Sequence, residues 1–320
     1  MLPLVLMSSS TKKSSSRFLI EASISDKTMK KYKDAVVRFL DWCDEHGHDA
    51  STMESLDDLV TEYFHNVYEM NDGVGKGLAS CTLYGLIKFM PRCEAHLLSA
   101  KTSLTGWMKL QPGRSYPPLT WDLTVLIAIH MVQNGHIRHA IATLLAFDCF
   151  LRVGELVGLR RKDVADTGDR RMGSEYQGTS LRLKHTKTGP NQWVQVHDAQ
   201  VVELLRCVVT GTAKADDHLF PFSAAEYRNV FKTSCAQLGL SHRYVPHSLR
   251  HGGATRCHLL GHPIEDVLLR GRWSSVKSAR RYVQAGRALL LKTTVPPRLA
   301  GLAKLFTDNL LLTLSLSLPR

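Results

Sequence analysis

The sequence of 320 residues lacks the patterns that mark several protein classes. Its seven cysteines are an odd number, and no two of them form a CxxC pair. This argues against a disulfide framework or a cysteine-based zinc site and favours a reducing compartment. No run reaches the roughly 18 apolar residues that a membrane-spanning helix needs. Because internal repeats and coiled-coil heptads are also missing, we expect a globular protein without a membrane span.

Acidic residues are scarce relative to basic ones. The chain has 41 Lys and Arg against 29 Asp and Glu, so its net charge is +12. Residues 1–120 carry no net charge, whereas residues 121–290 carry +9 and residues 291–320 carry +3. Such an excess is typical of proteins that bind a polyanion, either nucleic acid or a membrane surface. We expect that partner to contact mainly the C-terminal half.

Composition and periodicity divide the chain into two mainly helical domains with flanking segments. Residues 1–22 are rich in Ser and Lys and predict a flexible leader. Helical periodicity over residues 23–110 predicts a first domain. The segment 111–118 contains three Pro and one Gly, which resist helix formation and suit a linker. A second domain is expected at residues 119–290, followed by the apolar tail 291–320.

Four helices are expected in the first domain. Ser25 or Asp26 can cap the first helix, and Ser55 begins a capping-box-like pattern for the second. The other two are predicted at residues 76–98 and 104–110 from the spacing of their apolar residues.

Strand signals are confined to one zone of the second domain. Residues 180–185 and 193–196 alternate between apolar and polar side chains, and a Gly-Pro turn separates them. This pattern predicts a β-hairpin within an otherwise helical domain, so the fold class is α+β and mainly α. Helices are expected at residues 121–133, 136–150, 199–209, 224–238, 248–260, 264–270 and 275–284.

The first two segments that suit a phosphate group carry an arginine and a lysine. Arg152 follows an apolar helix and precedes Glu155 by three residues, so the carboxylate can hold the guanidinium if both lie on one helical turn. Lys187 lies at the tip of the predicted hairpin, where an exposed lysine can reach a substrate. Lys184 lies on the same hairpin and is the alternative.

The other two segments lie in the C-terminal part of the second domain. His247 and Arg250 are three residues apart near the start of a predicted helix, where anions are favoured. Trp273 follows a pair of arginines, and Tyr282 lies among further cations that would favour its phenolate form. His247 and His251 also have the spacing of a metal pair. However, Ser248 follows His247 where the zinc-protease motif has Glu, so we expect no metal.

In chain order these residues resemble the active site of the tyrosine recombinases, the phage integrase family. The resemblance covers about residues 23–290, and Tyr282 follows Trp273 by nine residues, which is the family's interval. The matching catalytic set is Arg152, Lys187, His247, Arg250, Trp273 and Tyr282, with Glu155 as a supporting residue.

The resemblance also implies an architecture. Members of this family place a helical core-binding domain and a mixed α/β catalytic domain around DNA as a C-shaped clamp. Residues 23–110 and 119–290 would be these two domains, and the linker 111–118 would cross the duplex. In similar enzymes a C-terminal helix docks on a neighbouring protomer. The tail 291–320 is therefore expected to be either such a helix or a disordered extension.

The chemistry implied by the resemblance is strand cleavage through a 3′-phosphotyrosine bond, without a cofactor, metal or ATP. Tyr282 would attack the phosphorus atom of a DNA phosphodiester. Arg152 and Arg250 would bind its non-bridging oxygens and stabilise the charge of the transition state. A 5′-hydroxyl group from a partner duplex would then rejoin the strands.

The remaining residues would move protons or orient the others. Lys187 would protonate the departing 5′-oxygen, and His247 would relay a proton or bind the phosphate. The indole N–H of Trp273 would donate to a phosphate oxygen, and Glu155 would orient the first arginine.

Three positions depart from the commonest pattern of the family. Most members have His where this chain has Trp273, and the Gly that usually precedes Leu-Arg is Phe150 here. Arg272 adds a cation beside Trp273. None of these changes removes a catalytic role.

The sequence therefore predicts a site-specific DNA recombinase or integrase, encoded by a mobile element, that acts as a homotetramer on two double-stranded DNA sites. A small-molecule substrate is not expected. The alternatives are a type IB topoisomerase-like or hairpin-resolving enzyme of the same chemistry, and a DNA-binding relative that no longer cleaves. We expect an intracellular protein that lies with the DNA, in the nucleus of a eukaryote or otherwise in the cytoplasm and nucleoid.

Overall fold

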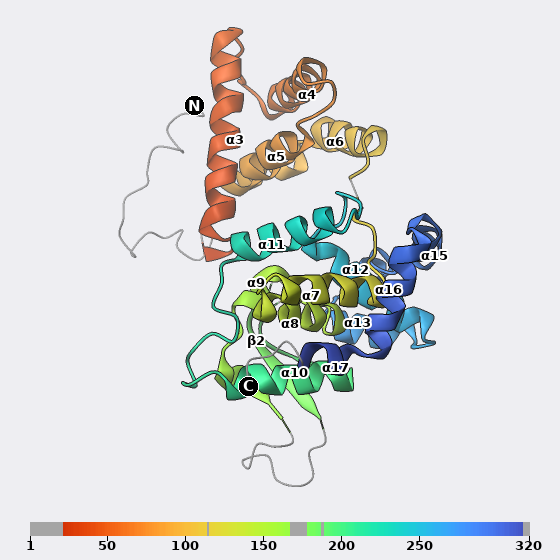
Figure 1. Cartoon of the computed structure of the whole chain (residues 1–320). Helices are drawn as coiled ribbons and strands as arrows, with labels where there is room; N and C mark the ends of the chain where they lie inside the picture. Colours follow the sequence, from red (N-terminus) through yellow and green to blue (C-terminus); the bar gives the residue numbers. More distant parts are fainter. Residues whose placement is uncertain (1–21, 114, 167–177, 187–188, 316–320) are drawn as a thin grey trace. The chain divides into compact units, whose positions relative to one another are not determined.

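The computed structural model describes residues 22–113, 115–166, 178–186 and 189–315 (Figure 1). The chain separates into two compact units, Met1–Arg114 and Ser115–Arg320. The division falls within the Pro-rich segment 111–118. Each unit has a hydrophobic core of its own.

Helices are the only regular secondary structure in the described part of the first unit. It contains α3 (Asp26–Glu45), α4 (Met53–Met70), α5 (Lys76–Phe89), the short 3-10 helix η1 (Pro91–Ala95) and α6 (Leu98–Leu110). Ser25 caps α3 by accepting a hydrogen bond from the Thr28 amide at 3.3 Å. Thr52 caps α4, and Ser55, the expected cap, instead completes a capping box from the third helical position.

One predicted helix is split in the structure. The apolar spacing predicts a single helix over residues 76–98, but α5 ends at Phe89 and η1 begins at Pro91. A proline has no backbone N–H to donate and clashes with the preceding turn, so the helix stops before it. Helix α6 then starts at Leu98, six residues earlier than the sequence indicates.

Aromatic rings form the centre of the first core. Phe39 and Trp42 of α3 both pack against Tyr63 of α4, with ring centroids 5.3 Å apart in each pair. Asp57 is the one charged side chain buried among the described residues of this unit. Its carboxylate accepts hydrogen bonds of 2.8 and 2.9 Å from two backbone amides at the start of α6, which ties α4 to α6.

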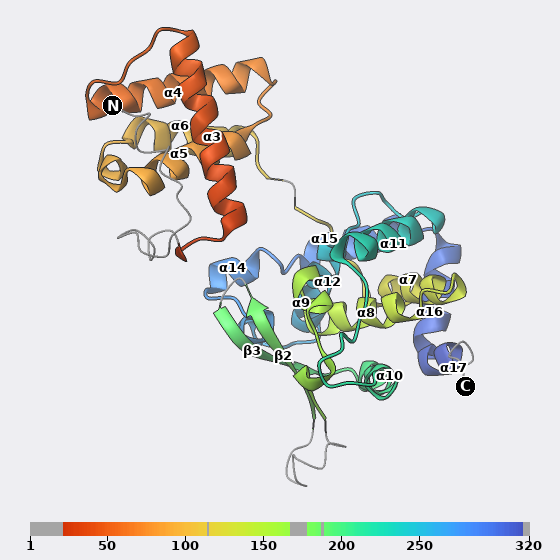
Figure 2. The same cartoon turned by 90° about the vertical axis from the view of Figure 1, so that its left-hand side faces the viewer.

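The second unit places a three-stranded antiparallel sheet among helices (Figure 2). The strands are β1 (Val164–Ala165), β2 (Thr179–Thr186) and β3 (Gly189–Val196), in that order. The expected β-hairpin is confirmed as the β2–β3 pair, in which Leu181 lies opposite Val194. Strand β1 has two residues, too few to give a periodic signal in the sequence.

The helices before the tail are α7 (Trp121–Gln133), α8 (Ile137–Asp148), α9 (Val153–Val157), α10 (Ala199–Thr210), α11 (Ala224–Gln237), α12 (Pro246–Leu259), α13 (Ile264–Gly271) and α14 (Val276–Arg280), with the 3-10 helix η2 (Arg161–Asp163).

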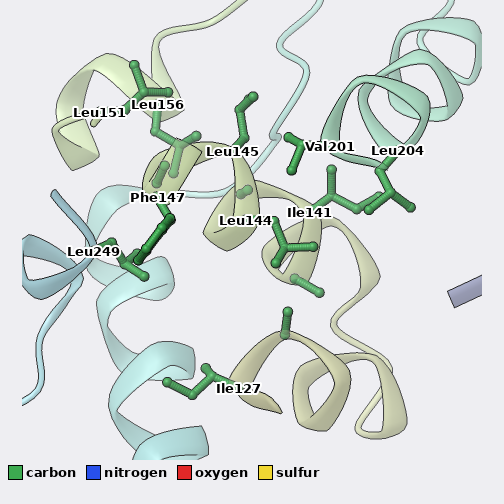
Figure 3. Packing of buried hydrophobic residues seen from close by; sticks show 14 of the residues in the cluster. Ile127, Ile141, Leu144, Leu145, Phe147, Leu151, Leu156, Val201, Leu204 and Leu249 are labelled. Carbon is green, nitrogen blue, oxygen red and sulfur yellow. The ribbon is translucent and has the colours of Figure 1, made fainter. Parts of the chain in front are cut away.

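Helix α8 lies at the centre of the second core. It packs against α7, α10 and α12, and every residue from His139 to Asp148 is buried. Figure 3 shows Ile141, Leu144 and Phe147 of α8 among apolar side chains of neighbouring helices. A helix that is buried on all sides gives a rigid base for the residues that follow it.

The tail folds back onto its own unit. It forms the end of α15 (Ala285–Thr294), then α16 (Pro297–Asp308) and α17 (Leu310–Ser315). Leu310 and Leu314 are buried in the second core, and α16 packs on α7. The described part of the tail is thus helical, and the docking of such a helix on a neighbouring protomer stays a prediction. Within the described ranges, tail included, no helix is long and apolar enough to cross a membrane.

Candidate active site

Arg152 and Glu155 form a closed pair at the start of α9. The Glu155 carboxylate accepts hydrogen bonds from the Arg152 amide at 2.9 Å and from its Nη1 at 2.6 Å. Arg152 has an extended backbone and precedes the first helical residue, and the Glu155 side chain accepts from its amide. The sequence suggests instead that both residues lie on one helical turn. The Glu155 side chain is 3% exposed and that of Arg152 is 23% exposed. The carboxylate is therefore hidden, while the guanidinium can still be reached.

A left-handed turn separates α8 from α9. The periodicity predicts a helix over residues 136–150, but α8 ends at Asp148 and Phe150 has a φ of 50°. Such a conformation costs a residue with a side chain about 1–2 kcal/mol. The Phe150 carbonyl accepts hydrogen bonds from Arg250 Nη1 and, at 3.2 Å, from Arg272 Nη2, which stabilise the turn.

Helix α12 carries His247 and Arg250. It begins at Pro246, two residues before the expected start, because proline is favourable at the first position of a helix. His247 is therefore the second helical residue, and it is half-buried.

Arg250 is completely buried. Its Nη1 donates to the carbonyl of Phe150 and its Nη2 to the carbonyl of Gly271. The helix can lie this close to the end of α8 because of Gly253, where a Cβ atom would be 2.1 Å from the Phe147 carbonyl oxygen. Backbone carbonyls from two separate segments thus fix the orientation of the guanidinium.

Two aromatic rings lie against the Arg250 guanidinium. Its central carbon is 4.5 Å from the centroid of the Trp273 ring and 5.3 Å from that of the Tyr282 ring. The two rings are 4.6 Å apart. Arg250 Nε and Trp273 Nε1 are buried without a hydrogen-bond partner among the described residues. Because buried donors favour an acceptor, the site has a capacity for an anion that the protein itself leaves unused.

Tyr282 lies in a turn and not in the helix that the sequence predicts at residues 275–284. Helix α14 ends at Arg280, and the Tyr282 amide donates to the Ala279 carbonyl at 2.9 Å. The hydroxyl of Thr255, on α12, donates to the Tyr282 carbonyl at 3.1 Å. The backbone is thus held while the phenol side chain is half-buried.

Two histidines contact the Tyr282 ring. The centroid of the His247 ring is 5.5 Å from that of the Tyr282 ring, and the His251 ring stacks on the Tyr282 ring with centroids 4.6 Å apart. Gln284 Nε2 lies 2.9 Å from His251 Nδ1, so in this pair the ring nitrogen accepts. The sequence shows the His247–His251 spacing but suggests only a metal pair for it. Among the described residues no cluster of metal-ligating side chains is present.

The site contains more positively than negatively charged side chains. Burial, followed by the fields of Arg250 and Arg152, lowers the pKa of His247 to about 4. Burial, followed by the field of His247, lowers the pKa of His251 to about 4. Burial, with the fields of Arg152 and Arg272, also lowers the pKa of Arg250. Both histidines are therefore neutral at pH 7, and a bound anion would relieve the repulsion among the arginines.

Only one of the two candidate lysines lies within the described residues. Lys187 lies outside the described residues. Lys184 lies on β2, two residues after Arg182 and therefore on the same face, where Arg182 pairs with Asp163 at 2.6 Å. The pKa of Asp216 is lowered by a hydrogen bond from a neighbouring lysine and, to a smaller extent, by the charge of Lys184. Lys184 thus lies in the field of an acidic residue.

Sequence reasoning missed three residues that build this site. Arg272 donates to Glu155 at 3.0 Å, His251 stacks on Tyr282, and Thr255 holds the Tyr282 backbone. Arg272 is visible in the sequence only as an extra cation beside Trp273. Thr255 carries no signal, since its role depends on a contact across 27 positions.

Comparison with known proteins identifies the family. The sequence profile of the phage integrase family matches residues 122–288, just over half of the chain. The chain belongs to the phage integrase family, the tyrosine recombinases. The tyrosine recombinase XerC of Brucella suis biovar 1 (strain 1330) is 26% identical over 254 residues, which are 74% of this chain and 77% of that protein. XerC of Brucella melitensis biotype 1 matches to the same extent.

Solved structures of phage integrase family proteins share the fold. The Tn1549 transposon integrase, in complex with circular intermediate DNA, aligns with a TM-score of 0.61 at 15% identity and covers 86% of this chain and 96% of that one. A lambda integrase dimer bound to a COC′ core site aligns with a TM-score of 0.59 at 15% identity over 84% of this chain and 92% of that one. The expected helical fold with a small sheet is therefore confirmed.

Proposed function

We propose that this protein is a site-specific recombinase that cleaves and rejoins DNA through a covalent bond between Tyr282 and a 3′-phosphate. The observation that carries the proposal is the position of Arg250. Its guanidinium is fully buried, lies beneath the rings of Trp273 and Tyr282, and is held by carbonyls on two segments. A rigid cation beside a half-exposed tyrosine is suited to binding a phosphodiester for attack.

The phosphate would be bound by donors that the protein leaves available. Arg152 offers the accessible side of its guanidinium, since Glu155 holds the other. Arg250 Nε and Trp273 Nε1 are buried donors that a phosphate oxygen would satisfy. Because these groups are in place beforehand, they need no reorganisation when charge builds on the phosphorane transition state.

The reaction exchanges one phosphodiester for another. The oxygen of Tyr282 forms a bond to phosphorus, and the bond from phosphorus to the 5′-oxygen breaks. His247, which is neutral at pH 7, relays the tyrosine proton or donates to the phosphate, and Lys187 protonates the departing 5′-oxygen. Since the energy of the diester is retained in the new bond, the step needs no ATP. The arginines supply the charge that a metal ion would otherwise provide.

Double-stranded DNA is the proposed substrate. It is supported by the net charge of +9 over residues 121–290 and by the DNA complexes of the Tn1549 and lambda integrases. Residues 23–110 would act as a core-binding domain that contacts the same duplex, so that the DNA is clamped. By the same resemblance, four copies would act on two sites, and a mobile element would encode the protein. It would then act wherever the cell keeps its DNA.

Covalent trapping tests the proposal. Purified full-length protein is mixed with nicked duplexes tiled across the DNA that flanks its own gene, and the reaction is quenched in SDS. We expect one protein–DNA adduct that Tyr282→Phe abolishes and that Tyr84→Phe, a half-exposed tyrosine of the first unit, leaves intact. An adduct that persists in Tyr282→Phe would assign the nucleophile to another residue. Binding without any adduct would favour a relative that no longer cleaves.

Two further readouts sharpen the assignment. Exchange of strands between two duplexes separates a recombinase from a topoisomerase-like or hairpin-resolving enzyme, which would reseal its own substrate.

Lys187→Ala and Lys184→Ala are compared on the same nicked duplex, and we expect the larger loss of cleavage rate for Lys187→Ala. The reverse order would make Lys184 the general acid.

A further inference from the structure

Arg272 occupies an unusual backbone position beside the site. It ends α13 with φ of 55° and ψ of 45°, in the left-handed region that favours glycine. Gly271 precedes it, where a Cβ atom would be 1.8 Å from the Trp273 ring, so only glycine lets that ring lie there. A long charged side chain in this strained position calls for a compensating interaction, which its contacts supply.

The Arg272 guanidinium points inward and not to solvent. Its side chain is 4% exposed, and its guanidinium bonds to groups inside the protein. Its Nη2 donates to Glu155 Oε2 at 3.0 Å and to the Phe150 carbonyl at 3.2 Å, and its Nη1 donates to the Cys149 carbonyl at 3.3 Å. It therefore binds both the turn before Arg152 and the carboxylate that holds Arg152.

This arrangement changes the net charge that the Arg152–Glu155 pair presents to a phosphate. Arg152 and Glu155 alone form a neutral pair, so the carboxylate would cancel much of the charge that Arg152 offers to a phosphate. Arg272 shares the same carboxylate from its buried side, and the three groups together carry one positive charge. With Arg250, the site then carries two positive charges, which match the dianionic phosphorane that forms when a tyrosinate attacks a diester.

We propose that Arg272 is a positioning residue that neutralises Glu155 from the buried side, so that Arg152 stays oriented yet keeps its charge for the scissile phosphate. The inference rests on the proposed function. It adds to the site a third arginine, which acts through Glu155 and Arg152 and not on the substrate.

A double-mutant cycle tests the coupling. Arg272→Gly suits the backbone, since glycine adopts the left-handed conformation freely. In single-turnover cleavage of the duplex that gives the Tyr282 adduct, we expect this variant to lose about 10²-fold in rate. Adding Glu155→Gln to Arg272→Gly removes the carboxylate whose charge Arg272 no longer balances. The cleavage rate of this double variant should be at least about tenfold higher than that of Arg272→Gly. A purely structural role predicts the opposite, a double variant slower than either single variant, and that result would overturn the proposal.

A matched control comes from Arg270, whose Nη2 pairs with Asp148 at 2.7 Å and not with Glu155. Arg270→Gln loosens the same region, but Glu155→Gln should give it no recovery. Equal recovery in both backgrounds would contradict a specific link between Arg272 and Glu155.

A second measurement keeps the inference separate from the cleavage reaction. The affinity of the DNA-free full chain for inorganic phosphate is measured by phosphorus NMR for the same set of variants. We expect the wild type to bind several-fold more tightly than Arg272→Gly, with the double variant in between. If no duplex gives an adduct but phosphate follows this order, strand cleavage fails and the role of Arg272 stands. Unchanged phosphate binding and cleavage in Arg272→Gly would refute the role while leaving cleavage intact.

Discussion

Each unit of the chain buries a carboxylate at the start of a helix, and the two carboxylates have different partners. In the first unit Asp57 accepts two backbone amides, those of Ser99 and Ala100. In the second unit Glu155 accepts one amide and two guanidinium groups, those of Arg152 and Arg272. Backbone amides of a helix are fixed whenever the helix forms, whereas guanidinium groups carry charge that can act on a ligand. Asp57 therefore stabilises a fold, whereas Glu155 joins the two arginines of the proposed phosphate site.

The same contrast extends to the two cores. The first core is held by aromatic packing, and Asp57 is its one buried charge among the described residues. The second unit buries several charged side chains near α8 and the sheet, namely Asp148, Glu155, Asp163, Arg250 and Arg272. Buried charge is expensive unless it is paired and hydrogen-bonded. We infer that the second unit accepts this cost because the site needs cations that are already dehydrated and oriented.

The largest effect is expected from Arg250→Lys, which keeps the charge but loses the planar fork. Arg250 reaches the Phe150 and Gly271 carbonyls with two separate nitrogens, whereas a lysine has one nitrogen at the end of its side chain. We expect the single-turnover cleavage rate to fall on the order of 10²–10³-fold. Arg206→Lys is the control, since Arg206 pairs with Asp166 at the surface of the same unit. Similar losses in both variants would mean that the buried geometry of Arg250 has no special role.

Phe150→Gly should lower the free energy of unfolding by about 2–4 kcal/mol, as followed by urea denaturation. Glycine relieves the left-handed backbone, but the loss of a buried phenyl ring outweighs that gain. Asp72 of the first unit is also left-handed, with φ of 47°, and it is exposed. Asp72→Gly should therefore change stability by less than about 1 kcal/mol. A net gain in stability for Phe150→Gly would show that the turn, and not the ring, dominates.

Asp57→Ala should destabilise the first unit by about 1–3 kcal/mol, because one buried and one partly buried amide lose their acceptor. The cleavage rate of the folded protein should change less than about twofold, since this carboxylate binds backbone amides of its own unit. Peptide-resolved hydrogen exchange measures the first effect, and single-turnover kinetics measure the second. A large loss of cleavage rate in Asp57→Ala would remove the distinction between the two carboxylates.

A further effect concerns pH. The pKa of His247 and of His251 is about 4 in the folded unit, below the value of about 6.5 expected in the unfolded chain. As the pH falls from about 6.5 towards 4, the unfolded state binds protons first, so the second unit loses stability over this window and no further below it. Urea denaturation between pH 7 and pH 5 should show this loss. In His251→Gln the slope should be shallower, and an unchanged slope would mean that His251 is not the group that titrates.

Much of the fold was predictable because it depends on local patterns. The apolar periodicity of α3 and α10 and the alternation of β2 and β3 are properties of neighbouring residues. Boundaries were missed where a distant contact or a single backbone angle decides them. Phe150 ends α8 early through its positive φ, and its carbonyl is bound by a guanidinium 100 residues away. For the tail the sequence left a helix and a disordered extension open, because its apolar residues indicate burial but not the surface that buries them.

The site shows the same division. The sequence by itself determined the family and the candidate residues, because side-chain types at set spacings limit the chemistry that a chain can perform. Only the tertiary structure decided how those residues share their partners. Glu155 lies between arginines at positions 152 and 272, and the second of these is 117 residues away. No local pattern encodes that contact, since it arises only when α9 and the end of α13 pack against the same buried turn.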